Sequence, residues 1–306
     1  MSETYLKATE HFQTILDFLR FALSRANDTT LYFGHGTDNA WDDMQALILG
    51  SLSLPFDIDP QLFQAKLTQD EKIKLCQQLE RRIISRIPVP YLLHEAHFCG
   101  LTFYVDERVI IPRSPLAELI GQQFSPWIDA DRVTRVLDLC TGCGCIAIAC
   151  CYAFPLAYVD AVDISPEALC VAEINRQRHG VQHELTLIES DCFDKVGRTP
   201  YDIIVSNPPY VGFEEMQSLP KEYLHEPRLA LAASNQGLAV VENIMKHAFE
   251  HLSEEGILVV EVGNSEEALV NAYPNVPFTW LEFEHGGHGV FMLTRQQLRT
   301  HIVGST

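Results

Sequence analysis

From Val133 to Val262 short apolar runs alternate with helix-length segments, and this alternation restricts the possible folds more than any other feature of the chain. Strands are predicted at 134–139, 157–162, 184–189, 202–206 and 256–262, and helices between them near 145–153, 166–179 and 236–251. Strands that alternate with helices form a mainly parallel sheet with helices on both faces. We therefore expect a doubly wound α/β domain.

The C-terminal part departs from this alternation. Residues 278–283 and 290–294 are predicted strands, and the glycine-rich segment 284–289 joins them. Two strands joined by a glycine-rich turn form an antiparallel hairpin. We expect this hairpin at the edge of the sheet.

The first 90 residues show helical periodicity instead. Apolar residues at 16, 18, 19 and 21–23 predict a first helix after Thr4. The cluster 37–39 (Thr-Asp-Asn) predicts the N-cap of a second helix, and Thr68 with Glu71 forms a capping box for a third. These features predict a compact helical domain.

Pro88 and Pro90 mark the end of this domain. Beyond them, 98–105 and 109–111 are predicted strands of a hairpin, and a helix is predicted from Ser114–Pro115 to about Trp127. The expected domains are a helical substrate-recognition domain at 1–95, a linking β-hairpin at 96–112 and the α/β domain at 113–306.

The segment Asn207-Pro208-Pro209-Tyr210 directly follows the predicted strand 202–206. Neither proline can donate to a β-ladder, so Asn207 ends the strand at the edge where open α/β sheets bind ligands. The Asn207 amide and the main-chain carbonyls offer acceptors on a stiff backbone, and Tyr210 adds a flat aromatic face. These acceptors and the aromatic face are suited to bind a planar NH2 group. A strand that ends at the prolines and continues as a loop explains the same residues equally well.

A second candidate site follows the first strand of the α/β domain. Gly142 and Gly144, within the segment Cys140-Thr141-Gly142-Cys143-Gly144, let the backbone approach a ligand at a helix N-terminus. Asp163 ends the next strand, 21 residues after Gly142, where an acid can accept both hydroxyls of an adenosine ribose. Asp191 follows the third strand and could accept from an adenine amino group. Alone, each acid could be a helix cap or a solvated carboxylate; their order at successive strand ends favours a nucleotide-like cofactor.

Cys140 and Cys143 also have the spacing of a redox or metal-binding pair. No second pair stands at ligand spacing, and the glycines explain the loop better. We therefore expect no metal. The nine cysteines are odd in number and bunched, which favours free thiols in a reducing cytoplasm.

Composition excludes several classes of protein. A hydrophobic content of 47% with 21% charged residues is typical of a folded globular chain. The net charge of −19 argues against a protein that binds a phosphate backbone and suits a basic protein partner, although solubility alone could explain it. We find no secretory signal and no apolar run of the ~18 residues that a membrane helix needs, so a cytoplasmic location is expected.

Together these residues resemble the class I S-adenosylmethionine-dependent methyltransferases, whose fold also has a C-terminal antiparallel hairpin. The segment 207–210 is similar to the motif shared by amino-group DNA methyltransferases and protein glutamine N(5)-methyltransferases. The helical domain, the hairpin and the 111–113 (Ile-Pro-Arg) entry resemble the glutamine family over nearly the whole chain. Within it, residues 113–118 and 34–42 look like those of enzymes that modify ribosomal protein L-three. Release-factor enzymes typically have Arg-Pro-Glu-Thr-Glu at the former and lack the latter.

The resemblance implies a set of site residues. Residues implied to bind S-adenosylmethionine are Asp138, Cys140, Thr141, Gly142, Gly144, Asp163, Asp191, Cys192 and Asn207. Those implied to bind the substrate are Asn207, Pro208, Pro209 and Tyr210, of which Asn207, Pro208 and Tyr210 act in catalysis. Cys140 stands where relatives commonly have Gly, and Cys192 where some have Trp, which could alter adenine packing.

The implied reaction is methyl transfer to the side-chain amide nitrogen of a glutamine in ribosomal protein L-three, either free or in an assembly intermediate. Methylation of release factors is the first alternative, and amino-methylation of DNA adenine is the second, against which the negative charge counts. A nicotinamide dehydrogenase fits only the glycine loop. A non-catalytic ribosome-bound scaffold would not need Asn207 and Tyr210.

Overall fold

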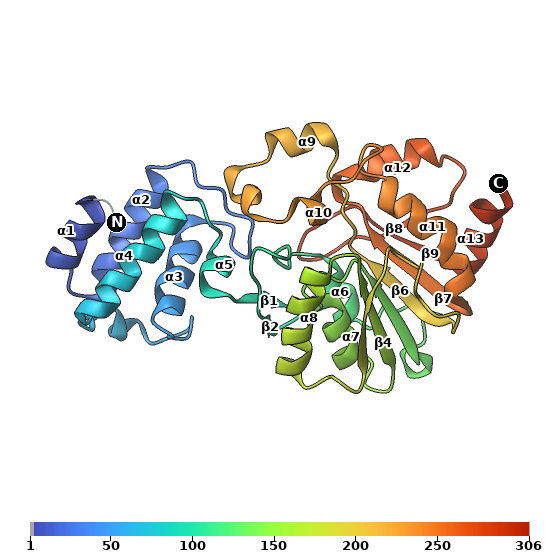
Figure 1. Cartoon of the computed structure of the whole chain (residues 1–306), viewed down its shortest axis with the longest axis horizontal. Helices are drawn as coiled ribbons and strands as arrows, with labels where there is room; N and C mark the ends of the chain where they lie inside the picture. The colour runs from blue at the N-terminus through green and yellow to red at the C-terminus, as the bar shows by residue number, and fades with distance from the viewer. Residues whose placement is uncertain (1–2, 306) are drawn as a thin grey trace. The chain divides into compact units, whose positions relative to one another are not determined.

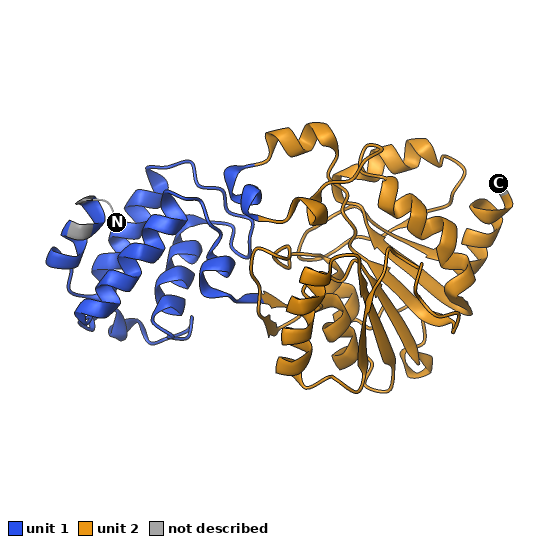
Figure 2. Ribbon diagram, in the orientation of Figure 1, with its two compact units in different colours: residues 1–96, 220–225 blue, residues 97–219, 226–306 orange. Residues whose placement is uncertain are grey.

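A computed structural model describes residues 3–305 and divides the chain into two compact units (Figure 2). The first unit comprises residues 1–96 and 220–225, and the second comprises residues 97–219 and 226–306. Residues 220–225, which the sequence prediction assigned to the 113–306 domain, thus belong to the helical unit.

The first unit is built from helices around one apolar core (Figure 1). Its helices are α1 (Glu3–His11), α2 (Ile15–Asn27), α3 (Ala40–Ser51), α4 (Gln69–Ile83) and α5 (Val89–Leu93), with the short 3-10 helices η1 (Pro60–Gln64) and η3 (Lys221–His225). The predicted N-cap of α3 and the capping box of α4 are confirmed: Asn39 accepts from the Asp42 amide, and Thr68 and Glu71 bond each other's backbone.

The first predicted helix is instead two helices, because Thr14 starts a new one. Its side chain accepts from the Asp17 amide, and the Asp17 carboxylate accepts from the Thr14 amide at 2.9 Å. This capping box satisfies the amides that open α2 and so separates it from α1.

A buried charged network surrounds Arg82, which is 1% exposed. Its Nε donates to Asp43 Oδ2 at 2.7 Å, and its Nη1 lies 3.4 Å from Glu222 Oε1. Glu222, also 1% exposed, accepts from the Tyr32 amide and lies 3.5 Å from Arg86 Nη1. Glu222 therefore attaches the segment 220–225 to the helical core.

The predicted linking hairpin is wrong in its position. Its strands are β1 (Ala96–Phe98) and β2 (Leu101–Phe103), joined by Cys99 and Gly100 at φ +50° and +72°. Positive φ at both central residues is typical of a two-residue hairpin turn. The segment after β2 is not a strand, because Asp106 accepts from the Arg108 amide and guanidinium and makes a local turn.

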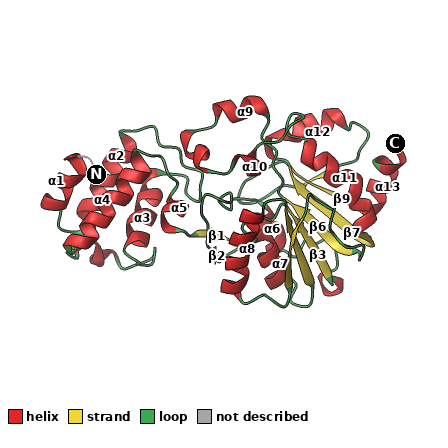
Figure 3. Ribbon diagram, in the orientation of Figure 1, coloured by secondary structure: helices red, strands yellow, loops and turns green. Residues whose placement is uncertain are grey.

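The second unit contains the predicted sheet, which lies between layers of helices (Figure 3). Its strands are β3 (Arg135–Leu139), β4 (Tyr158–Asp163), β5 (Leu185–Glu189), β6 (Tyr201–Ser206), β7 (Leu252–Glu261), β8 (Thr279–Trp280) and β9 (Val290–Thr294). They lie in the order β5-β4-β3-β6-β7-β9-β8; β3 to β7 are parallel, and β9 is antiparallel to β7 and β8. The doubly wound sheet and its antiparallel edge pair are confirmed.

The second unit also contains α-helices, several of which pack on the two faces of the sheet. They are α6 (Leu116–Gly121), α7 (Cys145–Ala153), α8 (Pro166–His179), α9 (Phe213–Ser218), α10 (Arg228–Leu231), α11 (Ala239–His251), α12 (Glu266–Ala272) and α13 (Arg295–His301). Helices α11 and α13 pack in one core cluster with Leu137 and Leu139 of β3. Asp138, which points to the opposite face, accepts from the first turn of α7. The predicted bounds of α7 and α8 are confirmed, whereas α6 ends at Gly121 rather than near Trp127.

We expect Glu222→Ala to destabilise the helical unit. The substitution removes one of the two carboxylates around the buried Arg82 and an acceptor for the Tyr32 amide, which should cost about 3 kcal/mol of unfolding free energy. Urea denaturation measures this loss. The surface variant Glu255→Ala, which breaks an exposed ion pair with Arg132, should cost less than about 1 kcal/mol. Equal midpoints for the two variants would show that the Arg82 network does not stabilise the unit.

Candidate active site

The pairing of β3 with β6 brings the two predicted sites together. Leu139 lies opposite Ser206 in parallel register, and the Ser206 hydroxyl donates to the Leu139 carbonyl at 2.7 Å. The residues that follow, Cys140 and Asn207, therefore leave the sheet at the same edge. Strand order reverses here, with β4 and β5 on one side and β7 on the other, which is where open α/β sheets bind ligands.

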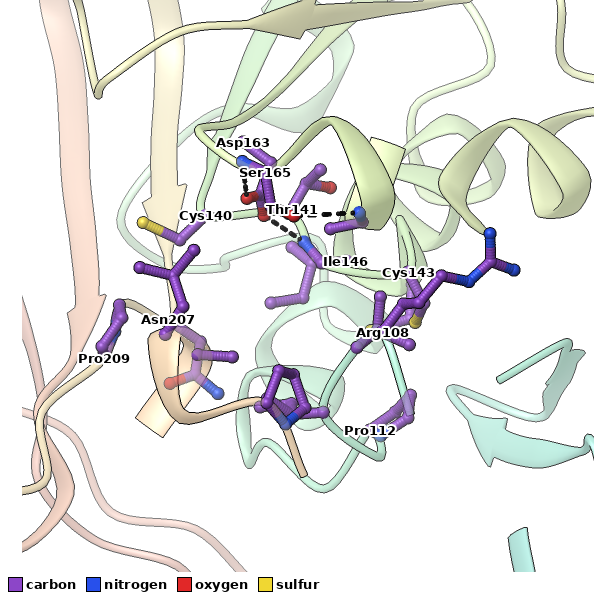
Figure 4. Close-up of a pocket in the computed structure, with 18 of the residues that line it drawn as sticks. Arg108, Pro112, Cys140, Thr141, Cys143, Ile146, Asp163, Ser165, Asn207 and Pro209 are labelled. Atoms are coloured by element: carbon purple, nitrogen blue, oxygen red, sulfur yellow. Dashed lines mark hydrogen bonds between the residues drawn. The ribbon is translucent and has the colours of Figure 1, made fainter. Parts of the chain in front are cut away.

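A cavity lies at this edge (Figure 4). Its walls come from the segments 108–114, 140–146, 163–168, 207–209 and 227–230, all in the second unit. Asp163 and Ser165 lie on one side in Figure 4, and Asn207 and Pro209 on the other. Of the predicted site residues, the lining includes Cys140, Thr141, Gly142, Asp163, Asn207 and Pro209.

Asp163 is the polar centre of the β4 side of the cavity. Its Oδ2 accepts from the Gly142 amide at 2.8 Å, and its Oδ1 accepts from the Ser165 amide at 2.9 Å. Burial raises the pKa of Asp163, and these backbone bonds act in the opposite direction. Each carboxylate oxygen makes one such bond and has a further lone pair for a ligand hydroxyl. The arrangement fits the vicinal hydroxyls of an adenosine ribose.

The backbone of the glycine loop is left-handed at two residues of the cavity lining. Gly142 has φ +56°, and a Cβ atom there would meet no other atom within 4 Å. Cys140, at φ +60°, also adopts a conformation that favours glycine. Burial raises the pKa of the Cys140 thiol well above its usual value, so it lines the cavity as a neutral group.

Asp138 and Gly144 were predicted to bind the cofactor, but they lie behind the cavity wall. Asp138 is fully buried, and its Oδ2 accepts from the Thr141 hydroxyl at 2.6 Å and the Ala147 amide at 3.1 Å. Burial raises the pKa of Asp138 to about 7. Gly144 has φ +82°, and a Cβ there would lie 3.3 Å from the Ala172 side chain. Asp138 therefore fixes the loop, and Gly144 lets α7 pack closely on α8.

Asp191 and Cys192, which follow β5 after Ser190, are also off the cavity lining. Asp191 is exposed, and Cys192 is 7% exposed and belongs to the core cluster under α11 and α13. Neither side chain therefore lines the part of the cavity around Asp163, which we call the Asp163 pocket.

Pro208 and Tyr210 complete the segment that begins at Asn207. Pro208 is buried beside the cavity lining. The Tyr210 hydroxyl donates to Glu261 Oε1 at 3.0 Å, and its ring packs on Gly263, where a Cβ would come within 2.6 Å of it. A side chain at Gly263 would therefore displace the Tyr210 ring.

Two buried acids that anchor the cavity walls were missed in the sequence. Glu226 accepts a bidentate pair of bonds from the Arg113 guanidinium and a third bond from the Ile111 amide at 3.0 Å. Glu261 Oε2 accepts from the Ser114 hydroxyl. Ile111, Arg113 and Ser114 are each more than 100 residues away in the chain from the acid that they bond, so no local spacing could have identified these pairs.

Neither unit contains a candidate set of metal ligands among its described residues. Within residues 3–305, no three His, Cys, Asp or Glu side chains are grouped as metal ligands would be, so Cys140 and Cys143 have no such partners. Nor does any helix in the described part of the chain have the length and apolar character to cross a bilayer.

Comparison with known proteins identifies relatives of the whole chain. Residues 122–234 match the family model described as methyltransferase small domain. Two proteins named ribosomal protein uL3 glutamine methyltransferase, from Neisseria meningitidis serogroups B and A, are each 48% identical over 293 residues, which cover 95% of this chain and 96% of theirs. Among solved structures, a methyltransferase from Pyrococcus furiosus is similar at 17% identity and a TM-score of 0.47, covering 64% of this chain and 89% of its own. The T. thermophilus 16S rRNA N2 G1207 methyltransferase in complex with AdoMet and guanosine is similar at 16% identity and a TM-score of 0.45, covering 65% and 49%.

We expect Asp163→Ala to weaken binding of S-adenosylmethionine at least about tenfold, because two hydroxyl bonds to a charged acceptor are lost at about 1.5–3 kcal/mol each. Isothermal titration calorimetry on the folded variant measures this loss. Asp191→Ala is the matched control: its exposed carboxylate lies off the cavity lining, so the affinity should change by less than about threefold. Unchanged affinity in Asp163→Ala would remove Asp163 from the site, and a large loss in Asp191→Ala would restore its predicted contact with adenine.

Proposed function

Because the chain belongs to the family of ribosomal protein uL3 glutamine methyltransferases, we propose that it methylates the side-chain amide nitrogen of a glutamine in uL3, the ribosomal protein L-three. The observation that carries this proposal is one cavity whose lining includes both Asp163 and Asn207, which come from the ends of β4 and β6 on either side of β3 (Figure 4). One wall suits a nucleoside and the other suits a planar amide.

The chain is a methyltransferase of the class I fold, and its methyl donor is S-adenosylmethionine. When bound, this cofactor supplies an electrophilic methyl group on a sulfonium sulfur. Asp163 would accept its ribose hydroxyls, and the glycine loop from Cys140 to Gly142 would bring backbone amides close to it.

Asn207 and Pro208 would act on the substrate amide. An amide nitrogen is a poor nucleophile, since its lone pair is delocalised into the carbonyl. The Asn207 side-chain oxygen and the Pro208 carbonyl can each accept one of its two N–H bonds, which orients the nitrogen and stabilises positive charge that develops on it. Because a proline has no N–H, no donor at 208 or 209 competes for these acceptors.

Tyr210 would hold the plane of the amide, and water would take the released proton. The substrate nitrogen gains a methyl group and loses one proton, and an N-alkylated amide cation is acidic enough to give that proton to water. Asn207, Pro208 and Tyr210 together form what we call the amide clamp. The clamp needs no dedicated base, which agrees with the neutral side chain of Asn207.

The partner proposal rests on charge. The chain carries a net charge of −19, and large-subunit ribosomal proteins are generally basic, so encounter would be steered electrostatically. Ribosomal RNA would bring negative charge and bury much of a bound protein. We therefore infer that the substrate is free uL3 or uL3 in an early assembly intermediate, met in the cytoplasm without direct recognition of nucleic acid. The helical unit, with its 34–42 stretch, is the proposed selector of this substrate.

Asn207→Ala should separate the amide clamp from cofactor binding. We expect cofactor affinity within about threefold of wild type and turnover lower by about 100-fold or more, the effect of losing one preorganised group at the reacting atom. Calorimetry and single-turnover methyl transfer measure the two quantities. Turnover that survives while cofactor affinity falls would show that Asn207 belongs to the cofactor site only.

Transfer of labelled methyl to free uL3, mature ribosomes and a release factor, measured side by side, tests the substrate. We expect free uL3 to be methylated fastest and its rate to fall as salt rises from about 50 to 300 mM, because the Debye length then drops below about 10 Å. Mass spectrometry of the product identifies the modified glutamine. Faster transfer to the release factor would overturn the substrate and leave glutamine methylation standing; transfer to DNA adenine in its place would overturn both.

A further inference from the structure

We propose that Glu261 is a positioning residue for the amide clamp, which it serves by holding the Tyr210 ring in one orientation. This inference rests on the proposed function, in which Tyr210 holds the plane of the substrate amide. Glu261 itself is not placed on the cavity lining, so it would act only through Tyr210.

The position of Glu261 follows from the sheet. It is the last residue of β7, which pairs with β6, so its side chain leaves the sheet at the same edge as Asn207. Glu261 is 5% exposed. Its Oε1 accepts from the Tyr210 hydroxyl at 3.0 Å, and its Oε2 accepts from the Ser114 hydroxyl, so each oxygen is directed at one hydroxyl.

Contacts of the ring and the backbone limit the rotation of the Tyr210 side chain, and the bond from its hydroxyl to Glu261 limits it further. Gly263 closes one side of the ring, as the 2.6 Å approach of a Cβ at that position shows. The Tyr210 carbonyl accepts from the Ser265 hydroxyl at 2.8 Å, which fixes the backbone. The contact with Gly263 leaves the ring free to turn the other way, and the bond to Glu261 opposes that movement.

Burying a carboxylate costs more desolvation free energy than a purely structural contact would need. Burial raises the pKa of Glu261, because the charged form loses water, while the two hydroxyl bonds and the nearby charges of Arg113 and His288 act the other way. Glutamine would fill the same space without that desolvation cost. A charged acceptor makes a stronger bond to a phenol hydroxyl than a neutral one does, and the clamp is the part of the molecule that needs a fixed tyrosine.

The chain contains a matched control, a second tyrosine–carboxylate bond at the opposite end of β6 from Asn207. Tyr201 is fully buried at the start of β6, and its hydroxyl donates to Asp160 Oδ2 at 2.7 Å. Like Tyr210 and Glu261, neither residue lines the cavity, but Tyr201 is the first residue of β6 and so lies away from Asn207, which follows the end of that strand. Tyr201→Phe thus removes the same kind of bond from the same sheet, and a general loss of packing would appear in it equally.

The test measures kcat and KM on free uL3, cofactor affinity by calorimetry and folding by circular dichroism for five enzymes. These are Tyr210→Phe, Glu261→Ala, Glu261→Gln, Tyr210→Phe with Glu261→Ala, and Tyr201→Phe. We expect Tyr210→Phe and Glu261→Ala each to lower kcat about tenfold, with cofactor affinity within about twofold, and the double variant to be no more than about twofold slower than the worse single one. Glu261→Gln, which keeps an acceptor, should recover at least about threefold over Glu261→Ala, and Tyr201→Phe should keep kcat within about twofold.

Independent, multiplying losses in the double variant would overturn the inference, as would a folded Glu261→Ala enzyme with kcat within about twofold of wild type. If Glu261→Ala does not fold, Tyr210→Phe and Glu261→Gln decide: both must lower kcat without lowering cofactor affinity. Asn207→Ala, run in parallel, distinguishes the failures. A turnover loss in Asn207→Ala with none in the Glu261 variants would refute only this inference, whereas a wild-type enzyme without transfer to glutamine would refute the proposed function and this inference with it.

Discussion

The parallel pairing of β3 with β6 is the constraint on which the site depends. Two loops 67 residues apart meet because Leu139 and Ser206 are register partners and share a side-chain hydrogen bond. A slip of one residue would turn Asn207 to the opposite face of the sheet, and a slip of two would move it about 7 Å along the strand. Either slip would separate the amide acceptors from the Asp163 pocket. The pairing of β3 with β6 therefore determines where the Asp163 pocket lies relative to the amide acceptors.

Buried carboxylates then fix the loops that leave this edge. Asp138 holds the glycine loop against α7, Asp163 joins that loop to the start of α8, and Glu226 holds the 111–113 segment. Each accepts from backbone amides or hydroxyls of these loops; Asp138 and Glu226 are buried and do so at the cost of desolvating a charge, whereas Asp163 is only partly buried. The site is thus preorganised by acids that do not all contact a ligand. This explains why Asp138, fully buried, resembles a cofactor-binding residue in the sequence and yet lies behind the wall.

Features of the sequence that act locally predicted the structure well, and pairings across the chain did not. The bounds of α7 and α8 follow from Gly144 before one and the Pro166 and Gly180 that flank the other, and the strand end at Asn207 follows from two prolines. The linking hairpin was misplaced because apolar residues continue past β2, so only the backbone of Cys99 and Gly100 marks its turn. Glu226 and Glu261 could not be found, since nothing near either residue indicates Arg113 or Ser114 as its partner. The attachment of 220–225 to the helical unit through Glu222 was missed for the same reason.

Cys140 shows how a single position can shape the cavity with little effect on the fold. Its left-handed backbone costs a non-glycine residue about 1–2 kcal/mol, and it is held there because both neighbours are fixed: the Leu139 carbonyl accepts from Ser206, and the Thr141 amide donates to the Val162 carbonyl at 2.9 Å. Glycine would relieve that strain, but it also loses more conformational entropy on folding, by about 0.5–1 kcal/mol. The two effects oppose each other, so the net change in stability is small. The cavity changes more, because glycine removes a neutral thiol from the lining between the Asp163 pocket and Asn207. A glycine at position 140 is therefore expected to change the fit of the ligand more than the stability of the fold.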